Sequence, residues 1–259
     1  MSRTLLTRRR LLGLGAAGAS SLVLGGCGQF DFLGETDSSA RAFLERANDL
    51  TYRAQRLLIR EGALAPEYSE SEIRQGQRPN GSRDPDTPQY LGLKADDFAG
   101  YRLAVTGLVE QPRSYSLAEL RNMPSRTQIT RHDCVEGWSC IAKWTGTPLS
   151  RILDEVKPKP AARFLVFHCF DRLDGNTSYY ESCDLIDARH PQTILAYGLN
   201  GQALPVANGA PVRVRIERAL GYKQAKYVRA IEAVDSFSRF GRGKGGYWED
   251  QGYDWYAGI

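Results

Sequence analysis

The chain has 259 residues, of which 42% are hydrophobic and 25% are charged, so its composition is that of an ordinary globular protein. Its formal net charge of +4 comes from residues 1–26, which contain Arg3, Arg8, Arg9 and Arg10 and no acidic residue. The remaining chain carries 30 basic and 30 acidic residues, and this balance gives no electrostatic reason to expect a nucleic-acid partner.

Residues 1–27 are predicted to be an export signal. The apolar run 11–24 has 14 residues, which is too short for an ordinary membrane span. Residues 7–12, Thr-Arg-Arg-Arg-Leu-Leu, resemble the twin-arginine motif of proteins exported in the folded state, with a general secretory signal as the alternative. Leu-Gly-Gly-Cys at 24–27 resembles a lipoprotein processing box, so a lipid on Cys27 is expected, and cleavage without a lipid stays open. We therefore expect a periplasmic protein, or one at the outer face of the cytoplasmic membrane, whose only membrane contact is a lipid anchor.

A linker and a helical arm are expected at residues 28–77. A serine at position 38 or 39 can cap a helix whose apolar residues recur at helical spacing up to Leu58, and Gly62 ends it. The segment 66–88 is rich in proline, glycine and asparagine and is expected to be a long loop, which is often functional in a compact domain. Residues 78–259 are expected to form one domain.

Most elements expected after residue 100 are strands, because apolar and polar residues alternate there. They are expected at 101–106, 126–130, 163–170, 193–199, 202–206, 212–216 and 227–237, with a hairpin turn at Asn200-Gly201. Short helices are expected after the Ser116–Glu119 capping box, after Pro148 and at 184–189. Since no strand–helix–strand unit repeats, the pattern predicts a β-rich α+β fold with a mixed sheet.

The C-terminal segment 247–256 is dense in tyrosine and tryptophan. Such a segment is too apolar to stay disordered, so it is expected to pack against the domain. The Gly-rich segment 241–246 before it lacks the strand-to-helix context of a phosphate-binding loop and is expected to be a plain loop.

Four cysteines remain after Cys27 is assigned to the signal. An exported chain can form disulfides, but a domain of this size does not need them, so at most one bridge is expected. Cys140 and Cys183 are the candidates for it.

The loop 131–138, Arg-His-Asp-Cys-Val-Glu-Gly-Trp, places Cys134 in a polar setting between a predicted strand and a Gly-Trp turn. A cysteine thiolate is a soft metal ligand and a good nucleophile, and both uses need an electropositive, partly open site, which Arg131 and His132 can supply. Three other interpretations stay open. Cys134 can be a buried structural cysteine, a nucleophile beside His132, or part of a zinc site with His168 and Cys169, although the spacing fits no zinc finger.

Five motifs occur in an order that resembles the sulfite oxidase-type molybdopterin domain. The resemblance is closest to bacterial exported members related to the periplasmic methionine sulfoxide reductase catalytic subunit, and it covers roughly residues 78–259. The motifs are Gly-Leu-Val at 107–109, the loop 131–138, Trp-Thr-Gly-Thr-Pro-Leu at 144–149, Asn-Gly-Ala-Pro-Val-Arg at 208–213 and Gly-Tyr-Lys-Gln-Ala-Lys at 221–226.

The resemblance implies a molybdenum–molybdopterin cofactor with Cys134 as the protein ligand to the metal. It implies that His132 and Arg131 steer a substrate oxygen beside the metal. One departure is that the reductase has a threonine near the position of His168 or Cys169. The residues implied to hold the pterin and its phosphate are Asn80, Asn208, Arg213, Gln224, Ala225 and Lys226.

The implied activity is a two-electron transfer of an oxygen atom, with an S-oxide, an N-oxide or sulfite as substrate, either small or protein-bound. Because the chain has no Cys-x-x-Cys-His haem motif, a separate haem protein or membrane cytochrome is expected to exchange the electrons. The alternatives are a zinc or other soft-metal protein that uses Cys and His, and a non-catalytic surface lipoprotein that binds a ligand.

Overall fold

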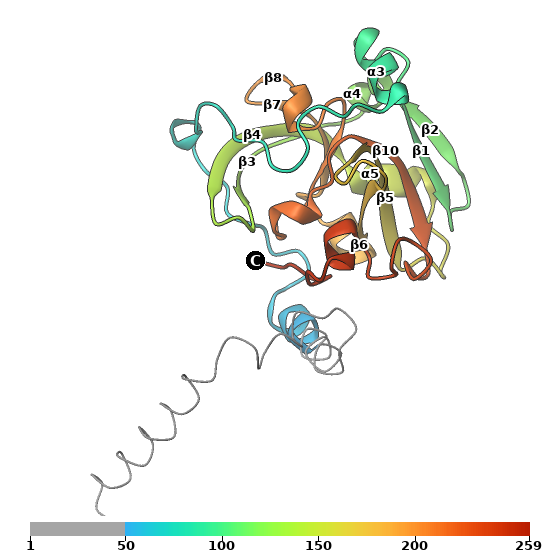
Figure 1. Cartoon of the computed structure of the whole chain (residues 1–259). Coiled ribbons are helices and arrows are strands. Elements are labelled where there is room, and N and C mark those ends of the chain that lie inside the picture. Colours follow the sequence, from blue (N-terminus) through green and yellow to red (C-terminus); the bar gives the residue numbers. More distant parts are fainter. Residues whose placement is uncertain (1–49) are drawn as a thin grey trace, which may run out of the picture. The chain divides into compact units, whose positions relative to one another are not determined.

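The computed structural model describes residues 50–259 (Figure 1). Residues 52–259 form one compact unit, which carries all the strands and named helices below. The predicted export signal, the lipid site at Cys27 and the start of the helical arm lie outside the described residues. Residues 50–58 are helical, as expected for the end of that arm.

The first sheet has five strands in the order β2-β1-β10-β5-β6. Strand β1 runs parallel to β10 and every other pair is antiparallel, so the predicted mixed sheet is confirmed. The strands are β1 (Arg102–Gly107), β2 (Arg113–Ser116), β5 (Phe164–Arg172), β6 (Ser178–Asp184) and β10 (Val228–Val234).

A second sheet, which is entirely antiparallel, has the order β3-β4-β7-β8, and β9 also pairs with β7. It was not expected as a separate sheet, since alternation along a strand does not say which strands pair. The predicted hairpin is confirmed, because Asn200 and Gly201 have φ of 50° and 79° between β7 and β8. The strands are β3 (Arg126–Asp133), β4 (Ser139–Pro148), β7 (Ile194–Leu199), β8 (Gln202–Ala203) and β9 (Arg213–Arg215).

The helices are short and mostly begin where the sequence predicts. The capping box of α4 is present, with the Glu119 amide donating to Ser116 Oγ at 3.1 Å and the Ser116 amide donating to the Glu119 carboxylate at 2.8 Å. Helix α3 was not expected, and it begins at Pro88, the last residue of the predicted loop. The helical elements are η2 (Glu70–Glu72), α3 (Pro88–Ala95), α4 (Leu117–Asn122), α5 (Leu149–Val156), α6 (Leu185–Arg189), η3 (Val206–Asn208), η4 (Gly221–Lys223) and α7 (Tyr247–Asp250).

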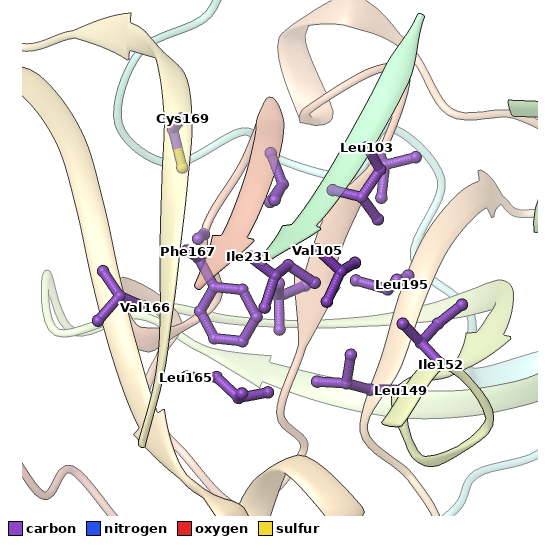
Figure 2. Close-up of a cluster of buried hydrophobic side chains, with 14 of the residues drawn as sticks. Leu103, Val105, Leu149, Ile152, Leu165, Val166, Phe167, Cys169, Leu195 and Ile231 are labelled. Atoms are coloured by element: carbon purple, nitrogen blue, oxygen red, sulfur yellow. The ribbon is translucent and has the colours of Figure 1, made fainter. Parts of the chain in front are cut away.

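The main core brings together side chains of the first sheet, helix α5 and strand β7, as Figure 2 shows. Leu103 from β1, Phe167 from β5 and Ile231 from β10 meet Ile152 from α5 and Leu195 from β7, and all five are fully buried. Burying each such side chain contributes about 1.5–3 kcal/mol to folding. The core therefore fixes the two sheets against each other and holds the loops at their ends.

Three further expectations can be compared with the structure. The aromatic C-terminal segment packs as predicted, with Tyr247 buried in the main core. At most one disulfide was expected, and none forms, because all four cysteines of the described residues, Cys140 and Cys183 included, are free. Alternation along 212–216 predicts one apolar and one charged face, yet Arg213 and Arg215 of the charged face are both buried on β9. No helix among residues 50–259 is long and apolar enough to cross a membrane.

Candidate functional site

Cys134 lies in the tight turn that joins β3 to β4. The last paired residues before it are His132 with Cys140 and Asp133 with Ser139. The Cys134 amide donates to the Trp138 carbonyl at 2.9 Å, and the Gly137 amide donates to the Cys134 carbonyl at 3.0 Å. Gly137 has φ of 83°, which a glycine adopts without strain. The hairpin thus presents one cysteine from the rigid end of a sheet.

The Cys134 side chain is 9% exposed and forms part of a cavity wall. Burial raises the pKa of its thiol, and the backbone amide of Glu136 opposes this in part. A thiol in this state is a poor nucleophile, whereas a bound metal ion deprotonates it outright. His132 does not activate it either, because the imidazole is held by other partners. The environment therefore favours a metal ligand over a nucleophile.

The cavity beside the Cys134 turn encloses about 630 Å³, its open mouth included. It extends from buried polar groups such as Lys226 to exposed residues such as Val135 and Tyr253. Its walls are formed by Asn80, Gly81, Ser82, Cys134, Val135, Glu136, Asp171, Leu173, Tyr179, Gly221, Tyr222, Gln224, Lys226, Trp248 and Tyr253.

Two buried cations, Lys226 in the cavity wall and Arg213 behind it, lie close together. Lys226 donates to the carbonyls of Ser82 and Ala207, and burial, followed by the charge of Arg213, lowers its pKa to about 7. Arg213 donates to the carbonyls of Asn208 at 2.9 Å and Gln224 at 3.2 Å, and its Nε has no partner. Neither cation pairs with a carboxylate among residues 50–259, so the pair favours binding of an anion.

Arg215 is the neighbouring cation on β9, and it is neutralised. Its guanidinium forms a two-pronged ion pair with Glu217, at 2.6 and 3.0 Å, and both side chains are fully buried. Both guanidinium groups of β9 lie over the ring of Trp144, at 4.3 Å for Arg215 and 5.0 Å for Arg213. This aromatic base holds Arg213 in place while leaving its charge available to a ligand.

His132 lies behind the cavity wall. Arg215 Nη1 donates to His132 Nδ1 at 2.8 Å, so Nδ1 is the acceptor and Nε2 carries the proton, without a partner of its own. Burial and the two arginines of β9 lower the pKa of this histidine well below its usual value, which keeps it neutral. Arg131 points elsewhere, with Nε 2.9 Å from the Asp133 carboxylate. Neither residue lines the cavity, so this geometry does not support the substrate-steering role expected of them.

Asp171, Ser82 and Asn80 supply further polar groups to the walls. Ser82 Oγ donates to Asp171 Oδ2 at 2.5 Å, while Asp171 Oδ1 is buried without a partner. Burial raises the pKa of this carboxyl group. Asn80 Nδ2 donates to the Gly221 carbonyl at 3.4 Å, a long contact. The unpartnered Asp171 oxygen is an acceptor that a ligand N–H group can satisfy.

The structure brings most of the predicted cofactor residues together. Asn80, Gln224, Lys226 and Cys134 line the cavity. Asn208 and Arg213 lie directly behind Lys226, since a β-carbon added at Gly209 would come within 3.1 Å of both Arg213 Cβ and Lys226 Cβ. Ala225 is buried, and its carbonyl accepts from the Val214 amide at 2.8 Å. Four further residues of the cavity wall were not predicted from the sequence: Ser82, Asp171, Trp248 and Tyr253. The only sequence signal for Trp248 and Tyr253 was the density of aromatic residues in the C-terminal segment.

This set of donors and acceptors fits molybdopterin. The two unpaired cations suit a phosphate, the free acceptor on Asp171 suits an N–H-bearing ring, and Cys134 offers a soft ligand to a metal. The zinc alternative finds no support, because no three His, Cys, Asp or Glu side chains among residues 50–259 gather as metal ligands. His168 is held on β5, with Nε2 3.2 Å from Glu232.

Comparisons with known proteins agree with this chemistry. The family model described as "Oxidoreductase molybdopterin binding domain" matches residues 90–239. A putative protein-methionine-sulfoxide reductase subunit YedZ1 of Azospira oryzae is 38% identical over 239 residues, which are 91% of this chain and 82% of that protein.

Two further relatives match over shorter stretches. Protein-methionine-sulfoxide reductase catalytic subunit MsrP of Ralstonia nicotianae is 38% identical over 52% of this chain and 44% of its own length. The protein of the same name from Xanthomonas campestris pv. campestris is 35% identical over 58% of this chain and 49% of its own length. The chain thus spans less than half of these two relatives. The crystal structure of the sulfane dehydrogenase SoxCD from Paracoccus pantotrophus matches 53% of this chain and 39% of that chain, with 25% identity and a TM-score of 0.49.

Proposed function

The chain belongs to the oxidoreductase molybdopterin-binding domain family, of the sulfite oxidase type, and we propose that it acts as a sulfoxide reductase. It is a molybdopterin-dependent oxidoreductase. The relatives named as protein-methionine-sulfoxide reductases support S-oxides over the N-oxides and sulfite that the sequence left open. The proposed substrate is a methionine-type sulfoxide, free or within a protein.

Cys134 is proposed as the protein ligand to molybdenum, and Arg213 with Lys226 as the phosphate-binding pair. The bound cofactor supplies two-electron oxygen-atom transfer. The polar ring of the pterin would be held by Asp171 together with four residues that were predicted from the sequence, namely Asn80, Asn208, Gln224 and Ala225. The buried Arg215–Glu217 pair and Trp144 keep Arg213 oriented, and His132 acts only through Arg215, as a positioning residue.

One observation carries the choice of a neutral S-oxide over sulfite. Those of residues 50–259 that line the cavity include Cys134, Val135, Glu136 and aromatic rings but no arginine or histidine. Lys226, the one cation in that wall, is turned to backbone carbonyls. Glu136 is paired with Arg78 at 3.9 Å, so an entering sulfite anion finds no unpaired arginine or histidine in this wall, whereas an uncharged sulfoxide needs none.

The proposed reaction consumes two electrons and two protons for each sulfoxide and yields a thioether and water. The S–O bond breaks, the sulfur is reduced, and the oxygen leaves as water. A separate haem protein or membrane cytochrome is proposed as the electron donor, because the chain itself has no haem-binding motif. The twin-arginine motif supports a periplasmic site of action after export of the folded, cofactor-loaded protein, and the Cys27 motif supports a lipid anchor there.

The test offers the cofactor-loaded protein two substrates in parallel, a capped peptide containing methionine sulfoxide with a reduced dye, and sulfite with an oxidising dye. The expected kcat/KM is at least about tenfold higher for the sulfoxide. In Glu136→Gln the Arg78 guanidinium loses its acidic partner, so the KM for sulfite should fall about two- to fivefold while the KM for the sulfoxide stays the same. A preference for sulfite in the unmodified protein would contradict the proposal.

A further inference from the structure

Three aromatic residues that contact one another line the cavity that contains Cys134, and we refer to Tyr222, Trp248 and Tyr253 as the aromatic rim. The Trp248 and Tyr253 rings are stacked, with centroids 5.3 Å apart and an interplanar angle of 26°. Tyr222 meets Tyr253 edge to face at 5.2 Å. Tyr253 is 38% exposed and Val135 is 47% exposed, so this end of the cavity is open to solvent.

The aromatic rim is held rigidly by hydrogen bonds and by a buried ion pair. The Tyr253 amide donates to the Trp248 carbonyl at 3.0 Å, and the Tyr222 hydroxyl donates to the Asp254 carbonyl at 2.8 Å. Lys223, next to Tyr222, contacts both Glu181 and Glu249, and all three side chains are buried. The segments that carry the three rings are therefore fixed to each other and to β6, so a ligand does not have to order them on binding.

The chemistry of this surface selects a class of ligand. Aromatic faces attract sulfur atoms and the methyl and methylene groups beside them, and each such contact contributes a modest amount of binding free energy. Leu173 and Val135 add aliphatic surface, and the acidic group beside them, Glu136, is paired with Arg78. A surface with one acidic group and three rings thus suits an uncharged alkyl sulfur compound.

We propose that the aromatic rim is the specificity-determining surface for the alkyl arm of the sulfoxide, and that it selects methionine-type side chains over small S-oxides. This inference rests on the proposed function. The open end beside Tyr253 and Val135 leaves room for the peptide that carries such a side chain. The rim acts in binding, and the reduction itself follows the balance of two electrons and two protons given above.

The test uses a non-reducible analogue, a capped peptide that contains methionine sulfone, and measures its dissociation constant on the cofactor-loaded protein by calorimetry. In Tyr253→Ala the dissociation constant should rise about three- to tenfold, and the KM for the sulfoxide peptide should rise in parallel, while kcat stays within about twofold. Tyr253→Phe keeps the ring and should behave like the unmodified protein. The KM for dimethyl sulfoxide, which lacks the alkyl arm, should change less than that for the peptide.

The matched control is Tyr256→Phe. Tyr256 belongs to the same segment, its ring contacts Tyr52 at 4.7 Å and Arg56 at 5.0 Å, and it does not line the cavity, so its variant should leave all constants unchanged. If Tyr253→Ala binds the sulfone and reduces the peptide as the unmodified protein does, the inference about the rim is overturned and the proposed function stands. If the unmodified protein reduces no S-oxide, the proposed function fails, and the inference fails with it.

Discussion

Gly221 lies so close to His132 that a β-carbon at position 221 would come within 2.6 Å of the imidazole Nε2. The imidazole cannot yield easily, because Arg215 holds its other nitrogen at 2.8 Å and the Trp138 ring lies 5.6 Å away. Gly221 also begins η4, whose next residue, Tyr222, belongs to the aromatic rim. The packing behind the Cys134 turn therefore sets the position of one cavity wall.

Gly221→Ala should destabilise the protein by about 1–3 kcal/mol, because the added methyl group overpacks a rigid site. The shift of η4 should also lower the amount of molybdenum that the purified protein retains. Thermal denaturation and metal analysis measure the two effects. Gly92→Ala is the control, since nothing lies within 4 Å of its added carbon and alanine is favourable in helix α3. Equal stability of the two variants would contradict the packing argument.

Lys226 predicts a pH dependence of the cofactor-free protein. Its folded-state pKa of about 7 lies below the ordinary value of 10.5. Burial and then the charge of Arg213 lower this pKa, and the charge of Asp171 raises it in part. Between these two values the unfolded chain binds the proton and the native protein does not, so the free energy of unfolding rises with pH. From pH 7 to 9 this contribution amounts to about 2 kcal/mol.

Urea unfolding at both pH values tests this expectation. Lys226→Met should remove the contribution, whereas Lys159→Met, at an exposed position, should retain it. With the anionic cofactor bound, Lys226 keeps its proton and the rise should disappear. An unchanged rise in Lys226→Met would show that this lysine is not the titrating group.

Lys223 predicts a large effect on the stability of the protein. Lys223→Met leaves the buried Glu181 and Glu249 carboxylates without a cation and should lower the free energy of unfolding by about 3–5 kcal/mol. For comparison, Arg189→Gln breaks an exposed ion pair with Asp154 and should change the free energy of unfolding by less than about 1 kcal/mol. Denaturant titration distinguishes these values, and a small change in Lys223→Met would indicate that the two carboxylates are already neutral.

Much of the local structure could be predicted from the sequence, because it depends on residues close together in the chain. The Ser116–Glu119 cap, the Asn200-Gly201 turn and the strand before Cys134 are of this kind. The separation of the strands into two sheets could not be predicted, since strand pairing joins residues far apart in sequence. Alternation also failed on β9, where the charged residues are buried because Glu217 and Trp144 surround them.

The same distinction holds for the site. Motif order predicted Cys134, Arg213 and Lys226, which the fold brings to one region, and their roles as ligands stay predictions. Asp171 had no sequence signal, because an aspartate at the end of a strand is ordinary until its unpartnered oxygen is found in a cavity. Arg131 was predicted as a site residue because it is close to Cys134 in the sequence. Successive side chains on a strand point to opposite faces, however, and the Arg131 side chain contacts Asp133 and not the cavity.

The central claim is that the Cys134 thiolate binds the molybdenum, and X-ray absorption at the molybdenum edge of Cys134→Ser tests it most directly. Cys140→Ser is the control, because Cys140 is buried on β4 and does not line the cavity. We predict that Cys134→Ser loses one sulfur ligand from the molybdenum spectrum together with sulfoxide reduction, and that Cys140→Ser loses neither. An unchanged number of sulfur ligands in cofactor-loaded Cys134→Ser would contradict the claim.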